Sequence, residues 1–180
     1  MNLPNSLSLI HDLDIRENVN LEKFTTMRLS ITGTIIIVKS ERALSTLVKE
    51  LNRNDLDFHL IGWGANQIIH NTKNTVFIKL EFNFERTYLD KVREEYDLPA
   101  SVPLNILTSH ASKFGLMGWE VFTGIPASLG GAIFMNAGTN LGEIGDLVNS
   151  VRILSSNGDI REEKICKNSF KYRSNNFVNK

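Results

Sequence analysis

The fold of this chain is restricted above all by a β-branched run that leads straight into a helical pattern. Residues 34–38 are Thr-Ile-Ile-Ile-Val, a composition typical of a buried strand. Ser40 follows as a good N-cap residue, and apolar side chains then recur at helical spacing from Ala43 to Leu51. We therefore expect a strand over 34–38 and an amphipathic helix directly behind it.

Two further strands extend this pattern into a first lobe. The turn-like residues 52–55 precede Phe58–Ile61, an apolar stretch that ends at a glycine. A polar turn at 71–74 then leads to Thr75–Leu80, where Val, Phe, Ile and Leu favour a third strand. The order predicts a β-α-β unit, and we place the first domain at residues 18–81.

The next part of the chain combines an ambiguous stretch with a clear helix. Residues 81–98 are charged and carry scattered aromatic side chains, and their spacing does not decide between strands and a helix. We expect short strands there and place the junction between the lobes within 81–91. Pro103 then opens a helical pattern with one apolar face, and Gly115 follows as a stop signal.

A hairpin is expected near the C-terminus. Residues 147–154 and 160–165 have the apolar alternation of strands, and Ser156-Asn157-Gly158 between them is a strong turn signal. We place the second domain at residues 82–180. The predicted fold class is α+β.

Composition argues against several classes of function. Twenty Lys and Arg balance twenty Asp and Glu, so the broad attraction to nucleic acid or anionic membranes is absent. Cys166 is the only cysteine and the four histidines are scattered, so we expect no internal disulfide and no metal site. The longest apolar stretch is far short of the roughly 20 residues that cross a bilayer, and residues 1–14 lack a signal-peptide pattern. We expect a cytoplasmic protein without nucleic acid, membrane or metal partners.

The turn Gly62-Trp63-Gly64-Ala65-Asn66 follows directly on a predicted strand. Small residues there allow backbone N–H groups to converge into an anion-binding concavity, which could hold a pyrophosphate. The same five residues also suit a plain turn at the end of a strand. They match neither the Rossmann nor the P-loop pattern, so both interpretations stay open on this segment alone.

The segment from Gly124 to Gly138 contains almost no charge. Its small, apolar and amide residues suit close approach to a large, flat, mostly uncharged ligand such as a flavin, with N–H groups and Asn136 supplying hydrogen bonds. The competing interpretation is a buried Gly/Ala turn that packs two elements tightly. Composition does not decide between them.

Tyr172 and Arg173 place a phenol beside a permanently charged guanidinium group. In an apolar pocket such an arginine binds a carboxylate through two hydrogen bonds and stabilises negative charge that develops during hydride transfer. Most single arginines are solvated surface residues instead, and that alternative stays open here.

Taken in order, five segments resemble the UDP-N-acetylenolpyruvoylglucosamine reductase family. The resemblance spans roughly residues 18 to 178, and its most specific piece is G-I-P-x-x-x-G-G-A-x-x-M-N-A-G, which begins at Gly124. The five segments are Thr25–Leu29, Gly62–Asn66, Gly118–Glu120, Gly124–Gly138 and Tyr172-Arg173.

The resemblance implies a fold and a reaction. The fold is the two-lobed FAD-binding fold of the vanillyl-alcohol-oxidase (PCMH) type, with FAD between the lobes. NADPH would reduce the flavin, which would pass hydride to the enolpyruvyl double bond of a UDP-sugar and yield UDP-N-acetylmuramate for peptidoglycan and cell-wall synthesis. The cofactor would supply the redox chemistry, while the protein would orient and polarise the reacting groups.

The resemblance also implies roles for individual residues. Arg173 would be catalytic by polarising the substrate carboxylate, and Tyr172 would join it in substrate binding. The FAD pyrophosphate would be held by Gly62, Trp63, Gly64, Ala65, Asn66, Gln67 and Ile68. The flavin would be lined by Gly124, Ile125, Pro126, Ala127, Ser128, Gly130, Gly131, Met135, Asn136, Ala137 and Gly138.

The chain departs from the family pattern in three places. Trp63 and Ala65 stand where the family usually has Gly and Ser, and we expect the bulky ring to weaken FAD binding. Asn175 stands at a serine position. Family members continue into a C-terminal substrate domain with a serine proton donor and a catalytic glutamate, whereas this chain ends at Lys180.

These departures leave three hypotheses. The first is a reductase with a truncated chain, and the second is a flavin- or nucleotide-binding module without reductase turnover. The third is a decayed protein that folds but binds nothing.

Overall fold

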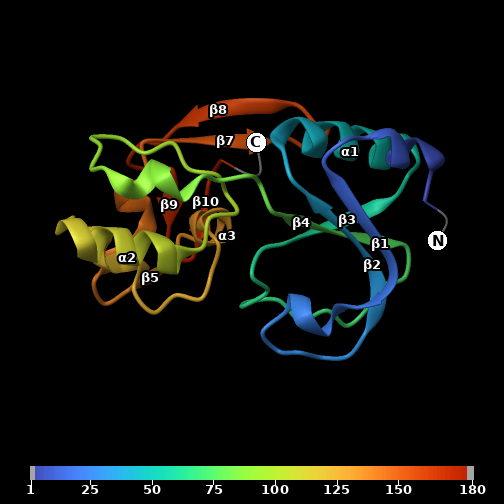
Figure 1. The fold of residues 1–180 in the computed structure, drawn as a ribbon, viewed down its shortest axis with the longest axis horizontal. Helices are drawn as coiled ribbons and strands as arrows, with labels where there is room; N and C mark the ends of the chain where they lie inside the picture. The colour runs from blue at the N-terminus through green and yellow to red at the C-terminus, as the bar shows by residue number, and fades with distance from the viewer. Residues whose placement is uncertain (1–2, 178–180) are drawn as a thin grey trace. The chain divides into compact units, whose positions relative to one another are not determined.

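The computed structural model describes residues 3–177, which form two compact units (Figure 1). Unit 1 contains the chain up to Asn83 together with Leu154–Ile160. Unit 2 contains Phe84–Ile153 and the chain from Arg161 onward. Each unit has its own hydrophobic core, so each is described by itself.

Unit 1 contains the predicted β-α-β unit, which is confirmed. Strand β2 (Thr32–Val38) leads into helix α1 (Glu41–Arg53), which is followed by β3 (Asp57–Ile61) and β4 (Thr75–Leu80). The sheet order is β1-β2-β4-β3, and β4 pairs in parallel with both of its neighbours. The carboxyl ends of these three strands therefore lie at one edge of the sheet.

The residues of β2 explain why it lies in the middle of this sheet. Ile35 to Val38 are at most 2% exposed. Ile36 and Val38 share a core cluster with the apolar face of α1, whereas Ile35 clusters with Leu21 of the 3₁₀ helix η2 (Leu21–Phe24). A strand covered on both faces requires a continuous apolar run, which this segment supplies. The Ser40 side chain caps α1, as predicted, by accepting from the Ala43 N–H at 3.2 Å.

Strand β1 (Leu13–Asn20) was not predicted. It pairs antiparallel with β2 at the edge of the sheet, and its register shifts between Arg16 and Val19. No residue of β1 is buried, so the apolar alternation that marks a strand in sequence is weak. The 3₁₀ helix η1 (Asn5–Leu9) precedes it and places Leu7 in the core beside α1.

The predicted hairpin turn at residues 156–158 is confirmed. It joins β7 (Ser150–Leu154) to β8 (Ile160–Lys164), and its tip packs on α1 within unit 1. Ser45 Oγ donates to the Gly158 carbonyl at 2.6 Å, and Asn52 Nδ2 donates to the Ser156 carbonyl at 2.6 Å. These two hydrogen bonds hold the turn against the exposed side of the helix.

Unit 2 is built around two helices and several short hairpins. Helix α2 (Leu104–Phe114) was predicted, and Gly115 ends it in the left-handed conformation with φ 66°. Besides residues 150–153 and 161–164 of the β7–β8 hairpin, the unit contains three further 3₁₀ helices, a short helix and four two-residue strands. They are η3 (Arg86–Asp90), η4 (Trp119–Phe122), α3 (Leu129–Phe134), β5 (Gly138–Thr139), β6 (Gly142–Glu143), η5 (Ile144–Leu147), β9 (Phe170–Lys171) and β10 (Ser174–Asn175).

The prediction of short strands in 81–98 is wrong. From Glu81 onward this stretch contains η3 and irregular backbone, and no strand is present within it. Tyrosine hydroxyls accept backbone hydrogen bonds that the carbonyls of a neighbouring strand would accept in a sheet. Tyr96 OH accepts from the Arg93 N–H and Tyr88 OH accepts from the Asp97 N–H, each at 3.0 Å. The Tyr96 ring also packs on Trp119, with 4.9 Å between the ring centroids.

We predict that Tyr96→Phe destabilises unit 2 by about 1–3 kcal/mol. The change removes the acceptor of the Arg93 N–H. It also removes the only hydrogen-bond partner that the ring of buried His110 has among the described residues, 2.9 Å from its Nε2. Tyr88→Phe is the control, because its hydroxyl bonds an exposed N–H that water can satisfy, and it should cost well under about 1 kcal/mol. Urea unfolding measures both, and equal losses would contradict the role assigned to Tyr96.

Candidate functional site

The turn that follows β3 is fixed by Gly64. This residue is buried and has φ +65°, and a Cβ added to it would lie 2.4 Å from the Phe24 carbonyl oxygen and 2.6 Å from Thr25 Cα. The Gly64 carbonyl accepts hydrogen bonds from the Thr26 N–H and hydroxyl, both at 3.2 Å. The Thr25–Leu29 motif and the Gly62–Asn66 motif therefore meet in unit 1, and only glycine fits at their contact.

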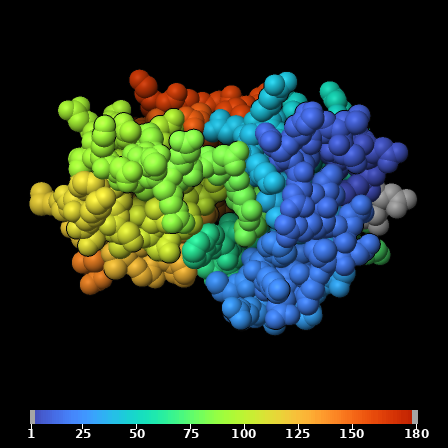
Figure 2. All heavy atoms as spheres, viewed as in Figure 1, coloured from blue at the N-terminus to red at the C-terminus, as the bar shows by residue number. Residues whose placement is uncertain are grey.

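Four consecutive backbone N–H groups in this turn are unpaired. Those of residues Trp63 to Asn66 donate to no acceptor in the described part of the chain. Part of the teal stretch that contains the turn lies at the surface in Figure 2. Successive N–H groups beside a left-handed residue form a concavity that binds anions, so the turn has the donors that a phosphate group requires.

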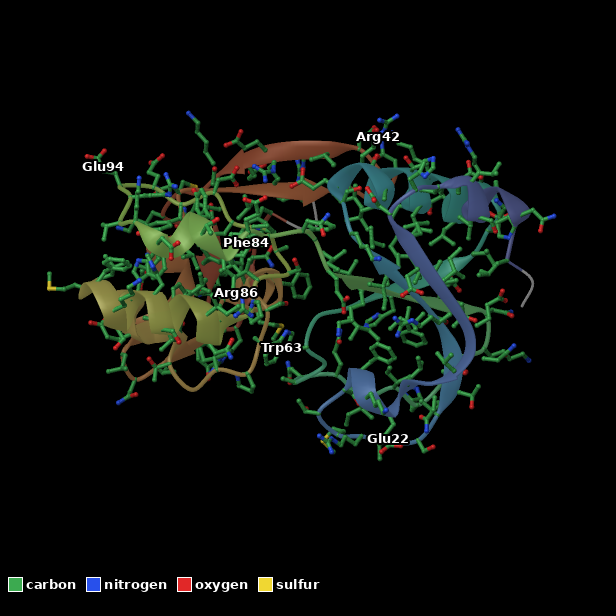
Figure 3. All side chains as sticks on the ribbon, in the orientation of Figure 1. Glu22, Arg42, Trp63, Phe84, Arg86 and Glu94 are labelled. Carbon is green, nitrogen blue, oxygen red and sulfur yellow. The ribbon has the colours of Figure 1, made fainter. Side chains whose placement is uncertain are left out.

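Two side chains flank these donors. Trp63, labelled in Figure 3, lies on the loop that leaves the sheet and is 40% exposed. Its φ is not positive, so this position does not need glycine for its backbone. Gln67 Nε2 donates to the Leu60 carbonyl at 2.9 Å, which ties the turn back onto β3. Gln67 Oε1 is buried and has no hydrogen-bond partner among the described residues.

Much of the Gly124–Gly138 segment uses its backbone hydrogen bonds inside unit 2. The Gly130 N–H donates to the Ala100 carbonyl and the Leu129 N–H to the Val102 carbonyl, both at 2.8 Å. A Cβ on Gly130 would lie 2.6 Å from Ala100 Cβ. The Ser128 side chain caps α3 by accepting from the Gly131 N–H at 3.4 Å. These residues thus have the close-packing role that the sequence left open, and their contact with a flavin stays a prediction.

The first residues of the same segment face solvent. Gly124 and Pro126 are exposed, and Ile125 and Ala127 are half-buried. Gly124 has φ +76°, and a Cβ added to it would meet nothing within 4 Å. This end of the segment is therefore the part that offers an uncharged surface to a ligand.

The side chain of Asn136 is engaged entirely within the protein. The residue is 1% exposed with φ +42°, and its amide bonds Glu143, Lys171 and Gly145. Both hydrogens of its NH₂ group are donated within the protein and the residue is buried, so the directional hydrogen bonds expected from it would have to come from another group.

Tyr172 and Arg173 form the turn of the β9–β10 hairpin. Arg173 has φ +52°, and its Nη2 donates to the Gly138 carbonyl at 3.2 Å. Tyr172 is 81% exposed. The structure thus brings Arg173 to the end of the Gly124–Gly138 segment, 35 residues earlier in the sequence.

Two residues near Arg173 have structural roles that the sequence analysis did not predict. Asn175 Nδ2 donates to the Phe134 carbonyl at 2.7 Å, so it pairs a carbonyl at the end of α3. Glu143 accepts from Asn136 at 2.6 Å. The departure from serine at position 175 was the only sequence signal for either residue.

Two kinds of structural feature are absent from the described residues. Within the described residues, no group of three or more His, Cys, Asp or Glu side chains is placed to hold a metal ion. None of the helices there has the length and apolar character that a membrane-spanning helix requires.

Comparison with known proteins gives both a family and relatives. A family model described as FAD binding domain matches residues 33–163. The UDP-N-acetylenolpyruvoylglucosamine reductase of Streptococcus pyogenes serotype M49 (strain NZ131) is 30% identical over 167 residues, which cover 91% of this chain and 55% of that protein. The protein of the same name from serotype M12 (strain MGAS9429) is 29% identical with the same coverage. The chain spans about half the length of these curated relatives.

Solved structures establish the fold. The reductase MurB from Thermus caldophilus superposes with a TM-score of 0.69 at 24% identity, over 91% of this chain and 56% of that chain. Cholesterol oxidase from B. sterolicum superposes with a TM-score of 0.54 at 15% identity, over 93% of this chain and 35% of that chain. The predicted α+β fold of the vanillyl-alcohol-oxidase (PCMH) type is confirmed.

We predict that Gly64→Ala costs about 3 kcal/mol or more of unfolding free energy, because left-handed strain adds to overlap with backbone atoms. Gly115→Ala is the matched control, since Gly115 has φ +66° and open space around its Cβ position. It should cost only the strain, about 1–2 kcal/mol. Urea unfolding of both variants measures the difference. Equal costs would show that the contact with residues 24 and 25 does not constrain the turn.

Proposed function

Because this chain belongs to the FAD binding domain family and corresponds to the N-terminal part of UDP-N-acetylenolpyruvoylglucosamine reductases, we propose that it binds FAD as the flavin-carrying part of such an enzyme. The full reaction would be NADPH-dependent reduction of the enolpyruvyl ether of a UDP-sugar to UDP-N-acetylmuramate. This reaction would serve peptidoglycan synthesis in the cytoplasm.

The observation that carries the proposal is the turn after β3. It combines four unpaired N–H groups at Trp63–Asn66 with a glycine that cannot carry a side chain. A diphosphate requires several backbone donors, and the N–H groups of Trp63–Asn66, which have no acceptor among the described residues, would supply them. The orphaned Gln67 Oε1 beside it is an acceptor that a ribose or ribityl hydroxyl would satisfy. The residues present therefore fit the ADP-ribityl part of FAD.

The uncharged surface at Gly124–Ala127 is proposed to hold the isoalloxazine ring. These residues are exposed or half-buried, and they carry no charged side chain that would require hydration. When bound, FAD would supply the capacity to accept hydride from NADPH and to pass it to the substrate. The protein would contribute orientation and exclusion of water from the flavin face.

Arg173 is proposed to bind the substrate carboxylate. Within the described residues the hydrogen bond from Nη2 to the Gly138 carbonyl is the only one of its guanidinium, which leaves several of its five N–H donors for an anion. A fixed guanidinium binds a carboxylate through two parallel hydrogen bonds. Such an interaction would withdraw electron density from the adjoining double bond and stabilise negative charge that develops there. Tyr172 is the adjacent exposed side chain that would contact the same substrate.

The second candidate function is a flavin- or nucleotide-binding module without reductase turnover. The observation that favours it is the family model that matches residues 33–163, which is described as an FAD binding domain and so supports flavin binding by itself. A positioned proton donor contributes about 10²–10⁴-fold to the rate, so binding and turnover are separable.

FAD titration followed by anaerobic reduction tests both candidates. We expect the protein to bind FAD with quenching of flavin fluorescence, and we expect NADPH to bleach the flavin absorbance. Binding without bleaching would favour the module over the reductase. A protein that stays colourless at saturating FAD would contradict both.

We predict that Trp63→Gly strengthens FAD binding several-fold. The half-exposed indole stands beside the unpaired N–H groups, and its removal opens the approach of the diphosphate. Ala65→Ser should strengthen binding by about tenfold, because the added hydroxyl supplies a phosphate donor worth about 1.4 kcal/mol.

Leu60→Ala is the control for both variants. Its side chain is 43% exposed on β3, outside the turn, and the change should leave FAD affinity as it is. Isothermal titration calorimetry with FAD gives the three affinities. Unchanged or weaker binding by Trp63→Gly would overturn the interpretation of this turn.

A further inference from the structure

The side chain of Asn136 is buried and hydrogen-bonded to other residues of the protein, unlike that of an asparagine that binds a ligand. It directly follows α3 and Met135, it is 1% exposed, and its backbone is in the left-handed region. Its Nδ2 donates to Glu143 Oε2 at 2.6 Å and to the Lys171 carbonyl at 3.1 Å, while its Oδ1 accepts from the Gly145 N–H at 3.0 Å. The amide thus makes three hydrogen bonds, two to the stretch that contains Glu143 and Gly145 and one to Lys171.

Glu143 determines which way this amide faces. A carboxylate only accepts hydrogen bonds and a backbone N–H only donates them. The NH₂ group of Asn136 must therefore face Glu143, and its oxygen must face Gly145. The short hydrogen bond to the carboxylate is charge-assisted, which makes it stronger than a neutral one. With this orientation fixed, the second hydrogen of the NH₂ group can reach the Lys171 carbonyl.

Lys171 is the last residue before the turn that carries Arg173. Strands β9 and β10 have only two paired residues each, and so short a hairpin does not hold its own turn. From the turn, Arg173 Nη2 returns to the Gly138 carbonyl, two residues after Asn136. The hydrogen bonds thus close a ring from Asn136 through Lys171 and Arg173 to Gly138 and back along the chain.

We propose that Asn136 and Glu143 are positioning residues that together hold the Arg173 guanidinium in place. Glu143 orients the amide of Asn136, and the amide holds the β9 end of the hairpin against the segment that Arg173 contacts. The inference rests on the proposed function, in which Arg173 binds the substrate carboxylate. Neither residue touches the substrate in this scheme.

The first test observes Arg173 without any ligand. Its Nε–Hε signal in a ¹H–¹⁵N spectrum is assigned by its loss in Arg173→Lys. In Glu143→Ala, which removes the acceptor, we expect the signal to move to the position of a solvated arginine. In Glu143→Gln, whose Oε1 still accepts from Asn136, the signal should stay where it is in the unaltered protein.

Glu94→Ala is the matched control, because Glu94 is an exposed glutamate of the same unit (Figure 3). It should leave the Arg173 signal unchanged. Asn136→Asp keeps the acceptor for the Gly145 N–H but places a second carboxylate against Glu143, and it should displace the signal as Glu143→Ala does. An unmoved signal in folded Glu143→Ala would overturn the proposal, as would failure of Glu143→Gln to retain it.

The second test separates this inference from the proposed function. FAD-loaded protein is titrated with UDP-N-acetylenolpyruvoylglucosamine, and the change in flavin absorbance reports binding. Glu143→Ala should weaken binding roughly 10- to 100-fold while FAD affinity stays the same, because a misplaced guanidinium loses its paired hydrogen bonds. If Arg173→Ala binds the sugar as tightly as the unaltered protein, the carboxylate-binding role of Arg173 fails. The signal displacement in Glu143→Ala would still support the positioning of Arg173 by Asn136 and Glu143.

Discussion

The burial of residues 35–38 of β2 is the constraint on which unit 1 depends. Its four apolar residues from Ile35 to Val38 are covered by α1 on one face and by the cluster around Leu21 on the other. A strand in this position must have parallel or antiparallel neighbours on both edges, and β4 and β1 provide them. Because β4 pairs in parallel with β3 as well, the chain leaves β3 at the carboxyl edge of the sheet. That geometry places the turn at Gly62 where ligands bind in α/β sheets.

Backbone hydrogen bonding distinguishes the two glycine-containing segments of the candidate site. In the turn after β3, glycine permits a contact with residues 24 and 25, and the neighbouring N–H groups have no acceptor in the part of the chain that the structure describes. In the second segment, glycine permits a contact with Ala100, and the N–H groups donate to carbonyls of the same unit. Similar composition therefore serves two purposes. The first segment is suited to an anion, and the second offers a neutral surface only at its beginning.

Side-chain polar groups replace regular structure throughout unit 2. Tyr88 and Tyr96 accept from backbone N–H groups in a stretch without strands, and Asn175 donates to the end of α3. The side-chain amide of Asn136 bonds residues of the strands β6 and β9 and of the 3₁₀ helix η5. The β5–β6 and β9–β10 hairpins of this unit have only two residues in each strand. They therefore depend on such contacts to place their loops, and the placement of Arg173 is one result.

The sequence by itself determined the elements whose signals are local. The run at 34–38, the helix that Gly115 ends and the turn at 156–158 were predicted because apolar period, capping and turn chemistry act over a few residues. The family motif at Gly124–Gly138 likewise identified the fold, since its fixed positions lie in one register.

Only the tertiary structure decided which distant groups meet. It placed β4 between β2 and β3, and it paired β1, whose exposed side chains carry little periodic signal. It also gave Asn136 partners as far away as residue 171 and Arg173 a partner at Gly138. The spacing of polar residues along the sequence does not identify their hydrogen-bond partners. Which partner a polar side chain bonds depends on the buried groups that the packed chain leaves unpaired. For that reason the sequence indicated the residues around the site, whereas the fold determined which of them are left for a ligand.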